Sequence, residues 1–125
     1  MKFLLSIATA LLLNTTTLFA QIKNPKTETV KVYGNCGMCK AKIEKAANQK
    51  NISKAEWNEE TAMATITYDE KLTSKDAILK KIALVGYDSD SFKATDAAYN
   101  KLHGCCQYDR PKTNTIETEA VKQLQ

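Results

Sequence analysis

The chain has 125 residues, of which 18 are lysine or arginine and 14 are aspartate or glutamate, so its formal net charge is +4. Arg110 is the only arginine, and the lysines are spread along the chain rather than clustered with aromatic residues. This mild and dispersed charge argues against a nucleic-acid-binding protein and favours a solvated surface, with a basic face for an acidic partner as the alternative.

Residues 1–20 have the pattern of a secretory signal peptide. Lys2 precedes an apolar run from Phe3 to Leu13, and small or polar residues then lead to a cleavage position after Ala20. The apolar run is too short to span a bilayer. We therefore expect a periplasmic or otherwise exported protein that is not inserted in the membrane after cleavage. The remaining chain of about 105 residues is enough for one domain.

The next part of the chain alternates between strand and helix patterns. A linker at residues 21–26 is followed by a strand, a helix and a second strand. A third strand, a second helix and a short fourth strand then complete the pattern. Ser74 or Thr73 is expected to cap the second helix and Gly86 to end it. The expected elements are strands 27–33, 52–58 and 61–68, helices 40–49 and 75–85, and a turn with a short strand at 87–92.

This order, βαββαβ, predicts an α+β fold, a ferredoxin-like sandwich in which two helices cover one face of an antiparallel sheet. The domain is expected to span residues 27–92. Residues 93–110 form an extension with a short helix after Thr95, and the polar residues 111–125 are expected to be a disordered tail. The expected core consists of Val30, Val32, Ile43, Ile66, Ile78, Ile82 and Val85.

Four cysteines occur as two close pairs, and the first pair is the most informative. Cys36-Gly37-Met38-Cys39 lies between the first strand and the first helix. The free N–H groups and partial positive charge of a helix start lower a thiol pKa. A thiolate pair at that position either binds a soft metal ion or exchanges disulfides, and the motif alone leaves both chemistries open.

The segment from Val30 to Tyr87 resembles the heavy-metal-associated domain family, which includes copper chaperones, soluble domains of copper-exporting ATPases and the periplasmic mercury-binding protein. The resemblance rests on the Cys36–Cys39 motif after a strand, the hairpin, and the late run Val85-Gly86-Tyr87-Asp88. It covers about 60 residues, more than half of the chain that remains after cleavage. The family commonly has methionine where this chain has Gly34; here a methionine lies inside the motif, as Met38.

The resemblance implies a non-enzymatic protein that holds a soft ion between Cys36 and Cys39 and passes it on by ligand exchange. Thiolates prefer Cu(I), and Hg(II), Zn(II) and Cd(II) are further candidates. The implied partner is a metal-exporting or metal-importing membrane transporter, or another metallochaperone. In the family, the position of Tyr87 faces the metal site; a ring that covers the helix end is the alternative for this residue.

A thiol–disulfide oxidoreductase is the alternative from another functional class. Thioredoxin-like enzymes also place a CxxC motif at a helix start, but they need a proline opposite the active site. The only prolines, Pro25 and Pro111, lie outside the expected domain. Hydrolysis by a Cys–His pair has little support, since the only histidine is His103 on an expected loop.

The second thiol pair, in the cluster His103-Gly104-Cys105-Cys106, leaves several interpretations open. It can fold back and add His103, Cys105 or Cys106 as further metal ligands, giving a four-coordinate site for Zn(II) or Cd(II) or a Cu(I) cluster. It can also form an independent docking or relay site. The remaining alternatives are a strained disulfide between neighbours, a disulfide with another chain, or unpaired thiols.

Overall fold

The computed structural model describes residues 21–112. The predicted signal peptide at residues 1–20 and most of the predicted tail, residues 113–125, lie outside the described residues. The elements follow in the order β1, α1, β2, β3, α2, α3 and a 3₁₀ helix η1. None of the helices within residues 21–112 has the length and apolar character needed to cross a lipid bilayer.

The sheet has three antiparallel strands in the order β1-β3-β2, with bounds Pro25–Lys31, Met63–Asp69 and Ser53–Trp57. The central strand β3 pairs Ala64 with Val30 on one side, and its Ile66 pairs with Ala55 on the other. β1 begins at Pro25, so the last two residues of the predicted linker belong to the strand. Pro25 pairs with Asp69 at the sheet edge, a position where its missing N–H costs no internal bond.

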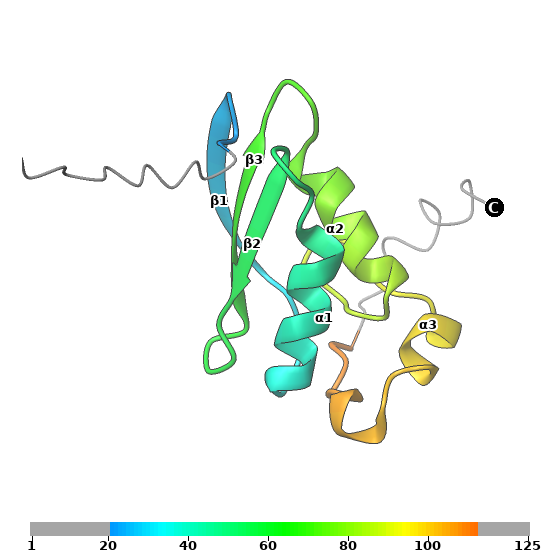
Figure 1. Cartoon of the computed structure of the whole chain (residues 1–125). Coiled ribbons are helices and arrows are strands. Elements are labelled where there is room, and N and C mark those ends of the chain that lie inside the picture. Colours follow the sequence, from blue (N-terminus) through cyan, green and yellow to red (C-terminus); the bar gives the residue numbers. More distant parts are fainter. Residues whose placement is uncertain (1–20, 113–125) are drawn as a thin grey trace, which may run out of the picture.

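Two helices, α1 (Gly37–Ala47) and α2 (Lys75–Leu84), cover one face of this sheet (Figure 1). The Ser74 hydroxyl accepts a hydrogen bond from the Ala77 N–H at 3.2 Å, which satisfies one free donor at the start of α2. The α+β ferredoxin-like fold class is therefore confirmed. The core between the two layers includes Val30, Val32, Ile43, Trp57, Ile66, Ile78, Leu79 and Ile82.

Val85 was expected in the core, but it is 41% exposed. Helix α2 ends at Leu84, and Val85 is its C-cap residue with φ −96° and ψ 9°. The 3.6-residue periodicity that placed Val85 on the buried stripe no longer applies once the chain leaves the helix. The apolar stripe of α2 therefore stops at Ile82, which is completely buried.

The predicted fourth strand is reduced to a single bridge between Val32 and Ser89. The Tyr33 N–H donates to the Asp88 carbonyl at 2.8 Å, which places this segment beside the end of β1. The chain then turns back, because the Ser89 N–H donates to the Phe92 carbonyl at 2.7 Å. The turn-forming run of Asp and Ser residues at positions 88–91 explains why pairing does not continue.

Residues 93–110, hereafter the C-terminal segment, pack against the domain and contribute to its core. The segment contains α3 (Asp96–Asn100) and η1 (Gly104–Cys106). Leu102, Cys106 and Tyr108 are buried in the same apolar cluster as the strands and helices. The segment lies at the end of the molecule where α1 begins, in yellow and orange in Figure 1.

Gly86 permits the close approach of this segment. Its φ is +104°, and a side chain there would place a Cβ only 2.9 Å from the carbonyl oxygen of Ala98. A residue with a Cβ would be strained in this backbone conformation and would also push α3 away. The predicted helix end at Gly86 is thus also a contact surface for the C-terminal segment.

Arg110 and Tyr108 fasten the end of the C-terminal segment to the domain. The Arg110 guanidinium donates from Nε and Nη2 to the two carboxylate oxygens of Asp88, each at 2.8 Å. The Tyr108 hydroxyl donates to the Gly86 carbonyl at 2.9 Å and accepts from the Asp88 N–H at 2.7 Å. Asp88 is 1% exposed, and its carboxylate also accepts the Ala94 N–H at 2.7 Å, so Arg110 and one backbone donor stabilise this buried charge.

Candidate metal centre

Cys36 and Cys39 lie at the start of α1, where the sequence pattern placed them. Cys36 is the N-cap residue, with extended backbone, and its carbonyl accepts the first helical bond from the Lys40 N–H at 3.1 Å. Cys39 lies in the first turn and is completely buried, whereas Cys36 is half-buried. Their Sγ atoms are 3.5 Å apart, so both thiols can reach one ion.

The helix start lowers the pKa of the Cys36 thiol. The main cause is the backbone N–H of Cys39; the Cys39 side chain, the Met38 N–H and the Cys106 side chain add to it. Partial burial opposes the shift but does not cancel it. These donors stabilise the thiolate, which is the form that binds a soft metal ion or attacks a disulfide.

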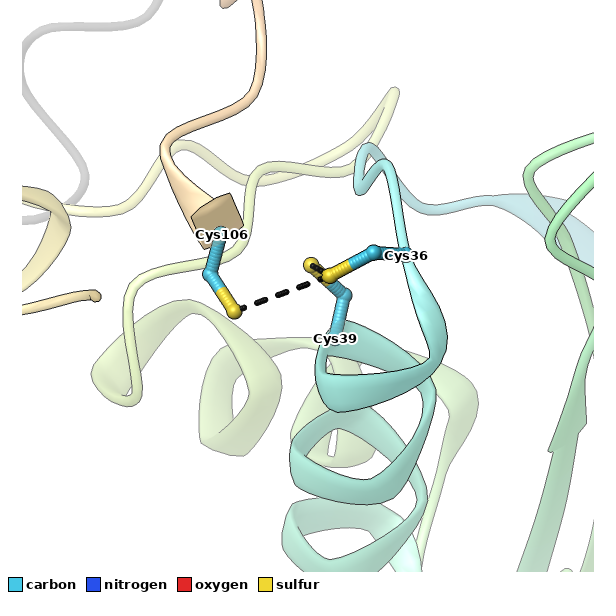
Figure 2. Close-up of side chains that lie close together, drawn as sticks. All are labelled: Cys36, Cys39 and Cys106. Atoms are coloured by element: carbon cyan, nitrogen blue, oxygen red, sulfur yellow. Dashed lines mark hydrogen bonds between the residues drawn. The ribbon is translucent and has the colours of Figure 1, made fainter. Parts of the chain in front are cut away.

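Cys106 joins this pair from the other end of the domain. Its Sγ lies 3.8 Å from the Cys36 Sγ, and the three sulfurs of Cys36, Cys39 and Cys106 lie within 4.8 Å of one another. Figure 2 shows the thiol of Cys106 pointing from η1 toward the start of α1. These three residues, hereafter the thiol cluster, are the group with metal-ligand spacing within residues 21–112.

Burial makes Cys106 electrostatically unlike Cys36. Removal from water raises the pKa of the Cys106 thiol to about 12, and the neighbouring Cys39 and Cys36 thiols contribute further. A metal-free Cys106 is therefore protonated at neutral pH. A cation that replaces this proton would remove the unfavourable desolvated charge, as metal binding generally does for buried thiols.

Cys105 and His103 lie beside the thiol cluster but outside it. Cys105 is exposed; its Sγ is 4.0 Å from the Cys106 Sγ and donates to the Met38 Sδ at 3.6 Å. His103 is also exposed, and its backbone carbonyl accepts the Cys106 N–H at 2.8 Å. Of the three residues proposed as additional ligands from the sequence, the structure brings Cys106 to the CxxC pair.

The Trp57 ring lies beside Gly34, the position where the family commonly has methionine. A Cβ at Gly34 would lie 3.0 Å from the Trp57 ring and 3.2 Å from the Cys39 Cβ. The indole Nε1–H donates to the Val32 carbonyl at 2.9 Å, which fixes the ring. The large ring on β2 thus occupies the space beside the loop, and sequence reasoning missed this because the two residues lie on different elements.

Tyr87 is completely buried beside the thiol cluster and stacks on Tyr108, with ring centroids 5.8 Å apart. Its hydroxyl is the buried side-chain polar atom without a hydrogen-bond partner among the described residues. Burial raises the pKa of Tyr87, and the nearby Cys39 and Cys106 thiols raise it further. Tyr87 therefore offers a neutral O–H close to two of the three sulfurs.

Sequence comparison relates part of the chain to copper-exporting P-type ATPases. It is 41% identical over 59 residues to that of Staphylococcus saprophyticus, which covers 46% of this chain, and 33% identical over 78 residues to that of Staphylococcus epidermidis, which covers 62%. The chain spans only 7% and 10% of the length of these ATPases. No model of a known protein family matches the chain.

Two solved structures are also similar. A CopZ metallochaperone is 29% identical, with 51% of this chain and 98% of that chain covered and a TM-score of 0.48. A copper form of a CopA variant from Bacillus subtilis is 30% identical, with 55% and 93% covered and a TM-score of 0.46. The resemblance to the heavy-metal-associated domain family thus rests on the sequence similarity to copper-exporting ATPases and on the CxxC motif at the start of α1.

Proposed function

We propose that this protein is an exported, non-enzymatic carrier or buffer of soft metal ions, with Cu(I) as its main cargo. The observation that carries the proposal is the Cys36–Cys39 pair, with sulfurs 3.5 Å apart at a helix start. Thiolates favour Cu(I) and similar soft ions over hard cations. The similarity to copper-exporting ATPases supports copper as the first candidate.

The position of the pair also supports ligand exchange with a partner. Cys36 is half-buried and its pKa is lowered, so one thiolate remains accessible to an incoming thiol while Cys39 is held inside. A partner that carries its own thiol pair can attack an ion at the Cys36 side. We therefore propose a metal-transporting membrane protein or another metallochaperone as the partner, in the periplasm after cleavage at Ala20.

Anaerobic titration with Cu(I) against a chelator of known affinity tests this function. The full chain is expected to retain Cu(I) in competition, and the Cys36→Ala/Cys39→Ala variant is expected to lose it. Cys105→Ala is the matched control, because that thiol is exposed and outside the thiol cluster. Equal retention by the wild type and the double variant, or failure of the wild type to compete, contradicts the proposal.

The lowered pKa of Cys36 also favours a second candidate, thiol–disulfide exchange. Such an enzyme would attack a substrate disulfide with the Cys36 thiolate and resolve the mixed disulfide with Cys39. The insulin-reduction assay with dithiothreitol separates the two candidates. Turnover well above the uncatalysed rate, abolished by Cys36→Ala, favours the oxidoreductase; no acceleration favours the metal carrier.

A further inference from the structure

We propose that Cys106 is a third thiolate ligand at the same site, so that this protein holds Cu(I) in a three-coordinate sulfur environment. The C-terminal segment then acts as a built-in retaining ligand. The protein releases its ion more slowly than a CxxC pair alone would. This inference rests on the proposed function of Cys36 and Cys39 and deepens it.

The separations of the sulfur atoms support three-fold coordination. Three thiolates about 2.3 Å from a central ion, arranged in a plane, lie about 4 Å from each other, whereas a linear pair would need about 4.6 Å. The Cys36 Sγ is 3.5 Å from the Cys39 Sγ and 3.8 Å from the Cys106 Sγ. The remaining pair, Cys39 and Cys106, lies within 4.8 Å, so one ion can contact all three sulfurs.

Cys106 is held at this place by contacts that do not involve the sulfurs. The Tyr108 hydroxyl binds the backbone of Gly86 and Asp88, and Arg110 binds the Asp88 carboxylate through two donors. The η1 turn upstream is closed by the bond from the Cys106 N–H to the His103 carbonyl. Folding therefore closes the loop from Cys36 to Cys106 before any ion arrives, and this lowers the entropic cost of a third ligand.

The buried hydroxyl of Tyr87 places an O–H donor beside the cluster. A buried O–H without an acceptor costs free energy, and this one lies near Cys39 and Cys106. When an ion displaces the protons from these thiols, their sulfurs become charged acceptors for that O–H. A metal-bound thiolate is a stronger acceptor for that O–H than a thiol, so the hydroxyl can stabilise the loaded site.

Cys105 differs from Cys106 in each of these respects. It is exposed, it contacts Met38 rather than the CxxC pair, and it is absent from the group with metal-ligand spacing. Its carbonyl accepts from the Cys36 thiol at 3.6 Å, so its backbone supports the cluster while its side chain points elsewhere. Cys105→Ala is therefore a matched control for Cys106→Ala: the same chemical change in the neighbouring residue.

Copper X-ray absorption counts the sulfur neighbours directly. The full-length wild type, Cys105→Ala and Cys106→Ala are each loaded anaerobically with less than one equivalent of Cu(I). We expect about three sulfur neighbours per copper in the first two proteins and about two in Cys106→Ala. In chelator competition, Cys106→Ala is expected to bind Cu(I) at least about tenfold more weakly, because one arm of a preorganised chelate is lost.

A wild-type sulfur count of two, or equal Cu(I) affinity in Cys106→Ala and Cys105→Ala, would overturn the proposal. The wild-type count needs no variant, so it remains decisive if Cys106→Ala does not fold. Failure of the underlying function looks different, since the wild type would then not retain Cu(I) against the chelator at all. Retention with two sulfurs would leave the CxxC carrier intact and remove only the role of Cys106.

Discussion

Cys36 and Cys39 are positioned by one turn of α1, whereas Cys106 depends on the contacts of the whole C-terminal segment. The first two thiols follow from a short sequence motif whose backbone forms a helix start. The third reaches the same sulfur cluster because Arg110 and Tyr108 are bound to the domain some distance away. The positions of Cys36 and Cys39 thus depend on local contacts, and the position of Cys106 depends on long-range contacts. The two parts of the cluster should therefore respond to different mutations.

The long-range contacts that position Cys106 are expected to be most sensitive to loss of the ion pair between Arg110 and Asp88. Arg110→Ala would leave a nearly buried carboxylate without its counter-charge, which typically costs about 3–5 kcal/mol. We expect this loss in the free energy of unfolding from urea denaturation. We also expect Cys106 to become accessible to alkylation, because the C-terminal segment is released.

The control for this variant is Lys101→Ala, an exposed change in the same segment. It is expected to shift stability by less than about 0.5 kcal/mol. If Arg110→Ala had an equally small effect, the C-terminal segment would not be held by its ion pair, and Cys106 would need another explanation for its position.

The local part of the cluster is best tested at Gly34, where the loop before Cys36 lies against the Trp57 ring. Gly34→Ala places a Cβ about as close to the indole ring as contacts allow, 3.0 Å, and is expected to destabilise the fold by about 1–3 kcal/mol through overpacking. Gly37→Ala is the matched control, because nothing lies within 4 Å of its Cβ position. Thermal unfolding of both variants separates crowding at the loop from a general effect of alanine.

An equal loss of stability in Gly37→Ala and Gly34→Ala would contradict this explanation. The loss would then arise from the backbone of the CxxC turn itself and not from the ring that supports it. A wild-type Cu(I) affinity in Gly34→Ala would further show that the two thiols tolerate movement of the loop.

The smallest expected effect is the pH dependence of the free energy of unfolding that arises from ionisation of Cys106. Its pKa is raised from an unfolded value of 9.0 to about 12, so the folded metal-free protein binds this proton more tightly than the unfolded chain. The corresponding stability is fully present below pH 9 and is lost as the pH rises toward 12. Urea denaturation in this range should show a steeper decline for the wild type than for Cys106→Ala; identical declines would argue against the burial of this thiol.

Several features could be predicted from sequence because they depend on neighbouring residues. The strand alternation around Ile66, the caps of α2 and α3 at Ser74 and Thr95, and the CxxC pair at a helix start all follow from local rules. Where a local rule was extended past its element, it was wrong. Val85 continues the helical period in sequence, but it lies beyond the end of α2 and is exposed.

The sequence by itself determined that two thiols share a helix start and that a second thiol pair follows the domain. Only the tertiary structure decided which of the adjacent residues Cys105 and Cys106 faces that site. Successive residues of a 3₁₀ turn point in directions about 120° apart, so one of the two must turn away. The segment that carries both cysteines is fastened by the Arg110 and Tyr108 contacts with Asp88, and these contacts join residues that no local pattern relates.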